Sequence, residues 1–439
     1  MNKLSSIAYY VTDKISSNDI SLSEYVTTDC ILQNKKGREV ASNLPPQPCC
    51  LTRYQRGDIL IANIRPYLKK VWFADIDGGA SSDVLVFRAK EGHSPSFLYA
   101  VLLQDSFFDY VMQGAKGSKM PRGDKEQILR YEMPILSCSE ESIGTFFLNL
   151  DQKIRLNEQI NQNLEAMAKQ LYDYWFVQFD FPNEEGKPYK SSGGEMLWNE
   201  KLKRKIPVGW HCGNLFEIAV FTNGLACQKF RPKDNEVPLP VIKIREMHDG
   251  ISVDTEKVTS NIPESVKVYN GDVLFSWSAS LEVMLWAYGL GGLNQHIFKV
   301  TSANDFPKSF YYFQLLDYVD VFKKMAEARK TTMGHITQDH LQQSTIAIPD
   351  NKDIADKFEE LISPIFRQII KLQEEISNLT KQRDELLPLL MNGQVSVNSD
   401  LAETGFILFC ISIATKVCFQ LIKSIIVNSV LIIAFYINP

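Results

Sequence analysis

Cationic and hydroxyl side chains gather in short loops that occur twice along the chain. KGSKMPR (116–122) holds three cations beside a Gly and a Ser, and ARKTTMGH (328–335) holds two cations, two Thr and a His. IRPYLKK (64–70) and SWSAS (276–280) each follow a strand that starts with Gly-Asp. Arg and Lys suit phosphates and guanine edges, and hydroxyls suit phosphates and several base edges. The loops predict nucleic-acid binding, with ordinary solvated loops as the alternative. The candidate residues are Arg65, Lys69, Lys70, Lys116, Ser118, Lys119, Arg122, Ser276, Ser278, Arg329, Lys330, Thr331, Thr332 and His335.

Catalytic signatures are scarce. The sequence has no G-x-x-x-x-G-K-[ST] loop, no G-x-S-x-G, no H-E-x-x-H and no G-x-G-x-x-G after a strand. GLGGLN (289–294) precedes a strand, which favours a hairpin turn, and EGK (185–187) is half of a nuclease signature without its Pro-Asp partner. The eight Cys form no C-x-x-C pair and no Cys/His cluster with zinc spacing. We therefore expect no catalytic residues and no metal ligands.

Charge and composition set limits on the class of protein. The chain has 439 residues, which is enough for two or three domains, and a formal net charge of −5. Residues 2–140 carry 17 basic and 16 acidic groups, and residues 200–350 carry 17 of each. Such a balance argues against loose, charge-driven binding of nucleic acid. The N-terminal sequence has no sustained apolar core and the Cys show no disulfide framework, so a cytoplasmic location is expected.

An internal repeat organises the chain. NGDVLFSWSA (270–279) matches RGDILIANI (56–64), and PKSFYYFQLLDYVDVF (307–322) parallels PSFLYAVLLQDSFFDYV (95–111). The offset between the copies hardly changes: Asp272 follows Asp58 by 214 residues, and the methionines of the two cationic loops lie 213 residues apart. Coincidence in an ordinary α+β chain is the alternative, but element order, Gly-Asp and offset all agree.

A long helix with an apolar seam follows each copy. The first helix, spanning 143–176, would be roughly 50 Å long at about 1.5 Å per residue, and Asn157 and Asn161 interrupt its seam. Seam asparagines tend to fix register and partner in coiled coils. Each helix alone is also compatible with an ordinary core-facing amphipathic helix. The predicted seam and partner-docking residues include Leu164, Met167, Leu171, Trp175, Leu379 and Leu386.

These observations predict an α+β fold: two α/β domains related by an internal repeat and joined by two long antiparallel coiled-coil helices. The Gly-, Pro- and Ser-rich segment after the first helix is interpreted as a linker. The predicted boundaries are 1–140 for the first domain, 141–180 for the central helix, 181–205 for the linker, 206–350 for the second domain, 351–393 for the distal helix and 394–439 for an apolar tail.

The chain resembles the specificity subunit of type I restriction-modification enzymes over residues 1–397. The sharpest match is LDQKIRLNEQINQNLEAMAKQLYDYWFVQFDFPNEEGKPYKSSGGEMLWNEKLKRKIPVGW (150–210), which is similar to the family's central region. RDELLPLLMNGQVSV (383–397) is similar to its distal region. The resemblance implies two target-recognition domains, each reading half of a bipartite site in double-stranded DNA, and helical spacers that set the gap.

The same resemblance implies partners and cofactors. Two methyltransferase subunits that bind S-adenosylmethionine would dock on the helices, and two translocase-nuclease subunits would bring ATP and Mg. The whole complex would be a site-specific endonuclease and adenine DNA methyltransferase, while this subunit would hold no cofactor, no small-molecule substrate and no catalytic residue. A methylation-only assembly is an alternative, and a coiled-coil protein-interaction scaffold without DNA binding is an alternative from another class.

The end of the sequence departs from the family pattern. GFILFCISIATKVCFQLIKSIIVNSVLIIAFYINP (405–439) is apolar, but Lys416 and Lys423 interrupt it. A membrane span needs about 20 apolar residues, and each Lys near a helix centre costs about 2.5–3.5 kcal/mol. We expect a tail without a role in recognition, with a membrane anchor as the lesser alternative.

Overall fold

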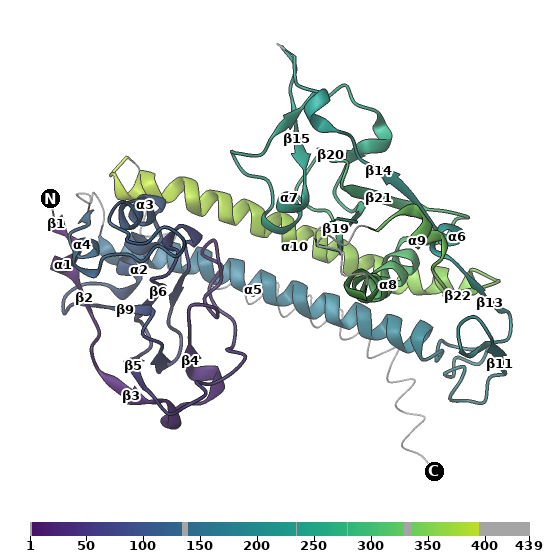
Figure 1. Ribbon diagram of the computed structural model, residues 1–439, viewed down its shortest axis with the longest axis horizontal. Helices are drawn as coiled ribbons and strands as arrows, with labels where there is room; N and C mark the ends of the chain where they lie inside the picture. Colours follow the sequence, from purple (N-terminus) through teal and green to yellow (C-terminus); the bar gives the residue numbers. More distant parts are fainter. Residues whose placement is uncertain (1, 134–138, 234, 279, 329–335, 395–439) are drawn as a thin grey trace. The chain divides into compact units, whose positions relative to one another are not determined.

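The computed structural model describes residues 2–133, 139–233, 235–278, 280–328 and 336–394. It divides into two compact units: residues 1–156 together with residues from 378 onwards, and residues 157–377. Two long helices, α5 (Glu140–Tyr172) and α10 (Asp353–Met391), contribute one end to each unit (Figure 1).

The centre of the first unit is an antiparallel sheet in the order β2-β9-β6-β7. Its inner strands, β6 (Ile59–Ala62) and β9 (Val84–Ala89), are rich in Val, Ile and Leu, which suit a pleated buried surface. Side chains alternate between two cores: Ile59 and Ile61 pack towards helix α2 (Pro95–Leu103), and Leu60 packs on the opposite face. The outer strands are β2 (Ala8–Tyr10) and β7 (Val71–Phe73).

A second sheet of the first unit has the order β3-β5-β8-β4, with β4 parallel to β8. The strands are β3 (Lys14–Ser16), β5 (Cys50–Tyr54), β8 (Gly78–Ala80) and β4 (Tyr25–Val26), and β1 (Asn2–Lys3) pairs separately with β10 (Glu132–Met133). The remaining helices are α1 (Leu4–Ile7), α3 (Asp105–Gln113), α4 (Lys125–Ile128) and the short 3₁₀ turns η1 (Ser17–Asp19), η2 (Leu22–Glu24) and η3 (Pro66–Leu68).

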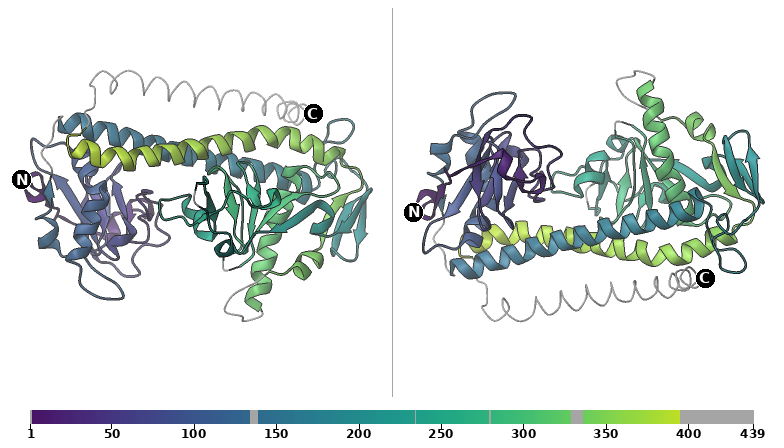
Figure 2. Two further views of the ribbon diagram at one scale, coloured as in Figure 1. Left: turned by 90° about the horizontal axis from the view of Figure 1, so that it is seen from above. Right: turned by 90° about the horizontal axis from the view of Figure 1, so that it is seen from below.

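The start of α5 and the end of α10 lie side by side in the first unit, as both views of Figure 2 show. Phe147 and Leu150 of α5 share one core with Leu387 and Leu390 of α10 and with the buried face of α2. Gly144 is required here, because an added Cβ would lie 2.3 Å from the backbone nitrogen of Phe97. Helix α2 of the first unit is therefore packed directly on this pair of helix ends.

The second unit repeats the sheet order of the first. Its antiparallel sheet runs β14-β21-β18-β19, the counterpart of β2-β9-β6-β7. In its other sheet, β15 is parallel and β17 antiparallel to β20, as β4 and β5 are to β8. The strands are β14 (Ala219–Asn223), β15 (Leu239–Ile242), β16 (Lys257–Val258), β17 (Lys267–Val268), β18 (Val273–Ser276), β19 (Glu282–Leu285), β20 (Gly291–Leu293) and β21 (Ile297–Ser302).

The remaining elements of the second unit frame these sheets. Strand β13 (Trp210–Gly213) pairs with β22 (Ile346–Pro349), directly before α10 begins. The helices are α6 (Leu215–Ile218), α7 (Ile244–Asp249), α8 (Lys308–Ala328) and α9 (Gln338–Gln342), with the 3₁₀ turns η5 (Cys227–Lys229) and η6 (Glu264–Val266).

In the second unit the end of α5 packs on the start of α10. Asn161 lies beside Ile369 and Trp175 beside Phe358, so the two helix segments run antiparallel. Tyr172 stacks on Phe313 of α8 with ring centroids 5.1 Å apart. A π-helical turn, η4 (Asp173–Val177), ends α5 and turns its aromatic side chains into this core.

The segment 181–205, expected to be a linker, contains more structure than the sequence indicated. Strands β11 (Met196–Asn199) and β12 (Arg204–Pro207) form a hairpin across its end. Phe181 stacks between Tyr189 and Trp210, with ring centroids 4.8 and 5.6 Å away. Aromatic packing therefore orders a stretch whose Gly, Pro and Ser content is typical of linkers.

Candidate nucleic-acid interface

The Gly-Asp turns of the two units are built in the same way. Gly57 and Gly271 have φ of 90° and 88°, a conformation that favours glycine. In the first unit Asp58 accepts a 2.8 Å hydrogen bond from the backbone of Gln55, and Asp272 accepts the same bond from Tyr269. A cation on the neighbouring strand neutralises each carboxylate, of which Asp58 is buried and Asp272 half-buried, and both turns start an inner strand of the main sheet. These cations are Arg88, which holds Asp58 through two 2.7 Å bonds, and Lys299, which lies 2.8 Å from Asp272.

Where those central strands end, each unit joins three chain segments through backbone atoms. The Asn63 carbonyl accepts from Gly123 (3.3 Å), and the Trp277 carbonyl accepts from Ile336 (3.0 Å). The same two residues donate to the carbonyls of Asp83 (2.9 Å) and His296 (3.3 Å). The pairs differ by 213 or 214 residues, as the sequence repeat requires. This junction is where the predicted polar loops start.

In the first unit the junction brings loops 64–70 and 116–122 together. Arg65 is in the left-handed region (φ 53°) and donates through its backbone to Pro121 at 2.8 Å. Ile64 forms an isolated antiparallel bridge with Arg122, and Arg122 exchanges two 2.9 Å backbone bonds with Lys116.

Asp124 fixes the far end of the cationic loop. Its carboxylate caps α4 by accepting from the backbone of Glu126 (3.0 Å) and Gln127 (3.1 Å). The backbone hydrogen bond from Gln127 and the contact with Lys116 hold the pKa of Asp124 below its usual range. In the second unit Thr337 occupies the same N-cap position before α9.

The side chains of the first interface differ in how free they are. Arg65, Ser118 and Lys119 are exposed and have no partner among the described residues. Lys116 is 84 % exposed and loosely paired with Asp124 at 3.2 Å. Arg122 is 59 % exposed and forms an ion pair with Asp83. These five residues are the ones available to bind DNA in this unit.

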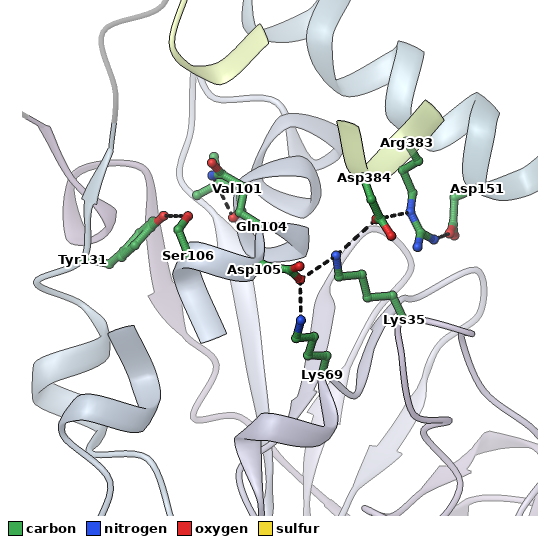
Figure 3. A network of polar contacts seen from close by, with 10 residues as sticks. All are labelled: Lys35, Lys69, Val101, Gln104, Asp105, Ser106, Tyr131, Asp151, Arg383 and Asp384. Carbon is green, nitrogen blue, oxygen red and sulfur yellow. Dashed lines mark hydrogen bonds and ion pairs between the residues drawn. The ribbon is translucent and has the colours of Figure 1, made fainter. Parts of the chain in front are cut away.

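Lys69 and Lys70 have structural partners. Lys70 donates a 2.7 Å hydrogen bond to the carbonyl of Thr28, so its ammonium group is bound within the unit. Lys69 lies 2.9 Å from Asp105 in the polar network of Figure 3, which continues through the buried Lys35 to Asp384. Burial acts to raise the pKa of Asp105, but Lys35 and Lys69 outweigh it and keep that pKa below its usual range. Lys69 therefore anchors its loop.

The structure corrects the prediction that the hydroxyls of Ser276 and Ser278 are available for DNA binding. Ser276 is fully buried: its Oγ donates to the Ser280 carbonyl and accepts from the backbone of Glu282 at 3.1 Å. Ser278 is 6 % exposed. The hydroxyl of Ser276 satisfies the backbone of this tight turn. Both residues are buried, so neither hydroxyl is exposed on the surface.

The other predicted residues of the second unit lie outside the described residues. They are Arg329, Lys330, Thr331, Thr332 and His335. The apolar tail, 405–439, also lies outside the described part.

Sequence reasoning missed an aromatic and amide cluster at the second junction. Trp277 donates through its indole nitrogen to Asn223 at 3.2 Å, and its ring centroid lies 5.6 Å from that of His296. His296 is exposed and contacts the amide of Gln295 at 3.3 Å. The repeat offset could have found Trp277, because it places this residue at the position of Asn63.

The predicted seam residues are buried to different extents. Leu164 and Trp175 are buried, whereas Met167, Leu171, Leu379 and Leu386 are half-buried. Tyr172, not Leu171, fills the seam near the end of α5. Asn157 and Asn161 are 1 % and 5 % exposed, as expected for seam positions.

Two other kinds of site were searched for within the described residues. No group of three or more His, Cys, Asp or Glu side chains is arranged to hold a metal ion there. No helix in that part of the chain is long and apolar enough to cross a membrane.

The chain is similar to known proteins in both sequence and fold. Residues 207–381 match the family model "Type I restriction modification DNA specificity domain". The MjaIX specificity subunit of Methanocaldococcus jannaschii is 23 % identical, covering 87 % of this chain and 86 % of that protein. The HindI specificity subunit of Haemophilus influenzae is 23 % identical over 84 % of this chain and 94 % of its own. The crystal structure of the type I system S subunit from M. genitalium matches the fold with a TM-score of 0.54 at 13 % identity, covering 89 % of this chain and 95 % of that one.

The chain is thus a mixed α/β protein that carries a type I DNA specificity domain at residues 207–381. Over most of its length it is similar to the specificity subunits of type I restriction-modification enzymes. Such subunits are non-catalytic, and the catalytic activities reside on other subunits. The resemblance noted in the sequence is thereby confirmed, and DNA target recognition is the role that fits the family.

Proposed function

We propose that this chain reads a bipartite sequence in double-stranded DNA, each unit contacting one half-site. One observation carries the proposal: the backbone junctions at Asn63 and Trp277 match one for one, while the side chains around them differ. Matched scaffolds with different exposed groups suit two readers of different sequences. Cations dominate the first, and aromatic and amide groups the second.

Helices α5 and α10 serve in this proposal as the spacer, an antiparallel coiled coil that sets the gap between half-sites. The buried seam supports a paired arrangement in each unit, for example Leu150 with Leu387 and Trp175 with Phe358. Two methyltransferase subunits would dock on the spacer and bind S-adenosylmethionine, and two translocase-nuclease subunits would bring ATP and Mg. The complex would then act as a site-specific endonuclease and adenine methyltransferase. No cofactor is assigned to this chain.

An exchange of recognition units tests the proposal. Residues 1–140 are replaced by the first domain of another specificity subunit, and the hybrid is expressed with the methyltransferase subunit. Methylated positions are then mapped genome-wide. One half-site should change and the other stay, with the gap unchanged. A change in both half-sites would contradict independent reading.

A second variant tests the spacer. Insertion of four residues, about one helical turn, after Gln162 should lengthen the gap and leave both half-sites intact. Retained activity with an unchanged gap would refute the spacer role. Absence of any DNA binding by the wild-type complex would favour the scaffold alternative, and methylation without nuclease recruitment would indicate a methylation-only assembly.

A further inference from the structure

Lys116 and Arg122 of the cationic loop each pair with a carboxylate, Asp124 and Asp83, and of the two only Arg122 carries a guanidinium fork. The guanidinium lies 3.2 Å from the Asp83 carboxylate, and the two side chains are 59 % and 37 % exposed. Arg65 and Lys119 nearby have no such acidic partner among the described residues. An exposed pair of this kind adds little to stability. We therefore consider a role for it in binding DNA.

Both residues of the pair are held in place by backbone contacts. Arg122 exchanges two 2.9 Å bonds with Lys116 and bridges Ile64. The Asp83 carbonyl accepts a 2.9 Å bond from Asn63 at the end of β6. An added Cβ at the next residue, Gly123, would lie 2.8 Å from the Asn63 side chain, so the chain is closely packed there. The backbone positions of Arg122 and Asp83 are therefore fixed by main-chain bonds, and the ion pair directs the guanidinium between them.

The Asp83 carboxylate determines which part of DNA the Arg122 guanidinium can bind. A phosphate approaching Arg122 would also approach Asp83, and like charges a few ångströms apart repel. A guanine edge is neutral and presents O6 and N7 as acceptors. Arginine has five donors in a rigid fork, and the ion pair leaves donors free for a bidentate contact. The geometry thus favours a base over the backbone.

We infer that Arg122 reads a guanine in the half-site of the first unit and that Asp83 is its positioning residue. This inference rests on the proposed function. The repeat places His296 where Asp83 stands and Trp277 where Asn63 stands, so the pair belongs to the first unit alone among the described residues. Lys119, exposed and without a carboxylate partner, is the contrasting case and suits phosphate.

Selection of bound sequences tests the inference directly. The full chain with its methyltransferase subunit is incubated with a randomised DNA pool, and bound sequences are read for wild type, Arg122→Ala, Arg122→Lys and Asp83→Asn. Lys119→Ala is the phosphate comparison. Arg130→Ala is the matched control, because Arg130 is exposed and pairs only loosely with Glu126 at 3.6 Å. Thermal melting and co-purification of the subunits check folding.

Arg122→Ala should lose the preference for G at one position of one half-site by about 5- to 150-fold, the range of a good bidentate contact. Arg122→Lys should lose much of it despite keeping the charge, because Lys lacks the fork. Asp83→Asn should relax the same position while binding random DNA more tightly. Lys119→Ala should weaken all sequences equally and lower the salt slope by roughly one unit.

Two results would overturn the inference. Arg122→Ala weakening all sequences equally would make Arg122 a phosphate contact. Asp83→Asn tightening all sequences with an unchanged site would remove the positioning role. Should Arg122→Ala fail to fold, Arg122→Lys and Asp83→Asn still decide between these outcomes. Absence of any sequence preference in the wild-type complex is distinguishable from both, because it would contradict the proposed function itself.

Discussion

A guanidinium nitrogen of Arg383 lies 3.4 Å from Oδ1 of Asp151, and both side chains are almost completely buried at 4 % and 3 % exposure. Figure 3 shows this pair at one end of the network that starts at Lys69. Asp151 also accepts from Arg155 at 2.7 Å and from the hydroxyl of Tyr99 at 3.0 Å. The Asp151 carboxylate thus links α5, α10 and α2 within the first unit.

Replacement of this carboxylate should be strongly destabilising. Asp151→Asn removes the carboxylate shared by Arg155 and the buried Arg383, and leaves Arg383 with Asp384 alone, so the free energy of unfolding should fall by up to about 3–5 kcal/mol. Urea denaturation followed by circular dichroism measures it. Glu385→Gln is the matched control, because its pair with Lys381 is 63 % and 72 % exposed, and such pairs contribute at most about 1 kcal/mol. Equal effects of the two changes would contradict the role given to Asp151.

The amide of Asn157 offers a stabilising substitution. Its nitrogen and oxygen are both buried and without a hydrogen-bond partner among the described residues. Asn157→Leu should therefore raise the free energy of unfolding by about 1–3 kcal/mol, at the expense of register specificity. Asn161→Leu should gain less, because Asn161 donates to the Ile369 carbonyl at 3.4 Å. Chemical denaturation of both variants tests this, and a loss of stability in Asn157→Leu would refute it.

His211 gives the second unit a pH-dependent contact. It lies 2.6 Å from Asp350 and 3.2 Å from Glu217. Burial acts to lower the pKa of His211, but hydrogen bonds to these carboxylates outweigh it and raise the pKa above its usual 6.5. The stabilisation should be fully present below about pH 6.5 and be lost as pH rises through the folded-state pKa.

The measurement compares wild type with His211→Gln at pH 5.5 and pH 8.5. Wild type should be the more stable at the lower pH, by under about 1 kcal/mol because His211 is half exposed. The difference should shrink at the higher pH. A difference independent of pH would show that His211 does not charge in this contact.

The buried hydroxyl of Ser276 separates structure from recognition. Ser276→Ala leaves the backbone of Glu282 without its acceptor, so about 1–3 kcal/mol of stability should be lost. The recognised sequence should not change. Ser118→Ala, at an exposed position, should leave stability unchanged within about 0.5 kcal/mol. Thermal melting measures the stability and methylation mapping the recognised sequence. A changed half-site for Ser276→Ala would show that Ser276 contributes to DNA recognition after all.

The repeat was the strongest signal in the sequence. The spacing of Asp58 and Asp272 predicted matched turns, because a Gly-Asp turn needs both a positive φ and a capping carboxylate. It did not show that loops 64–70 and 116–122 meet, because that contact depends on backbone bonds between distant segments.

The direction of individual side chains was not predictable in the same way. A hydroxyl after a strand can face water or satisfy the turn, and Ser276 does the latter. Nor could spacing show that Lys70 would donate to the Thr28 carbonyl, because that partner lies 42 residues away. In the seam, Tyr172 follows the buried Ala168 by four residues and is itself buried, whereas Leu171 is half-buried. Long-range partners of this kind depend on tertiary packing.

The hydrogen bonds that the junctions at Asn63 and Trp277 share are made by main-chain groups, and the Asn63 side chain adds one bond of its own to the Gly123 carbonyl. The main-chain bonds do not depend on which side chain each position carries. Substitutions at the positions of Asp83, Arg122 and His296 can therefore accumulate with little penalty to the sheet beneath them. Under the proposed function, point mutations in one unit would change its half-site without disturbing its framework, and the other unit would keep its own target. Recognition could then evolve faster than the fold that supports it.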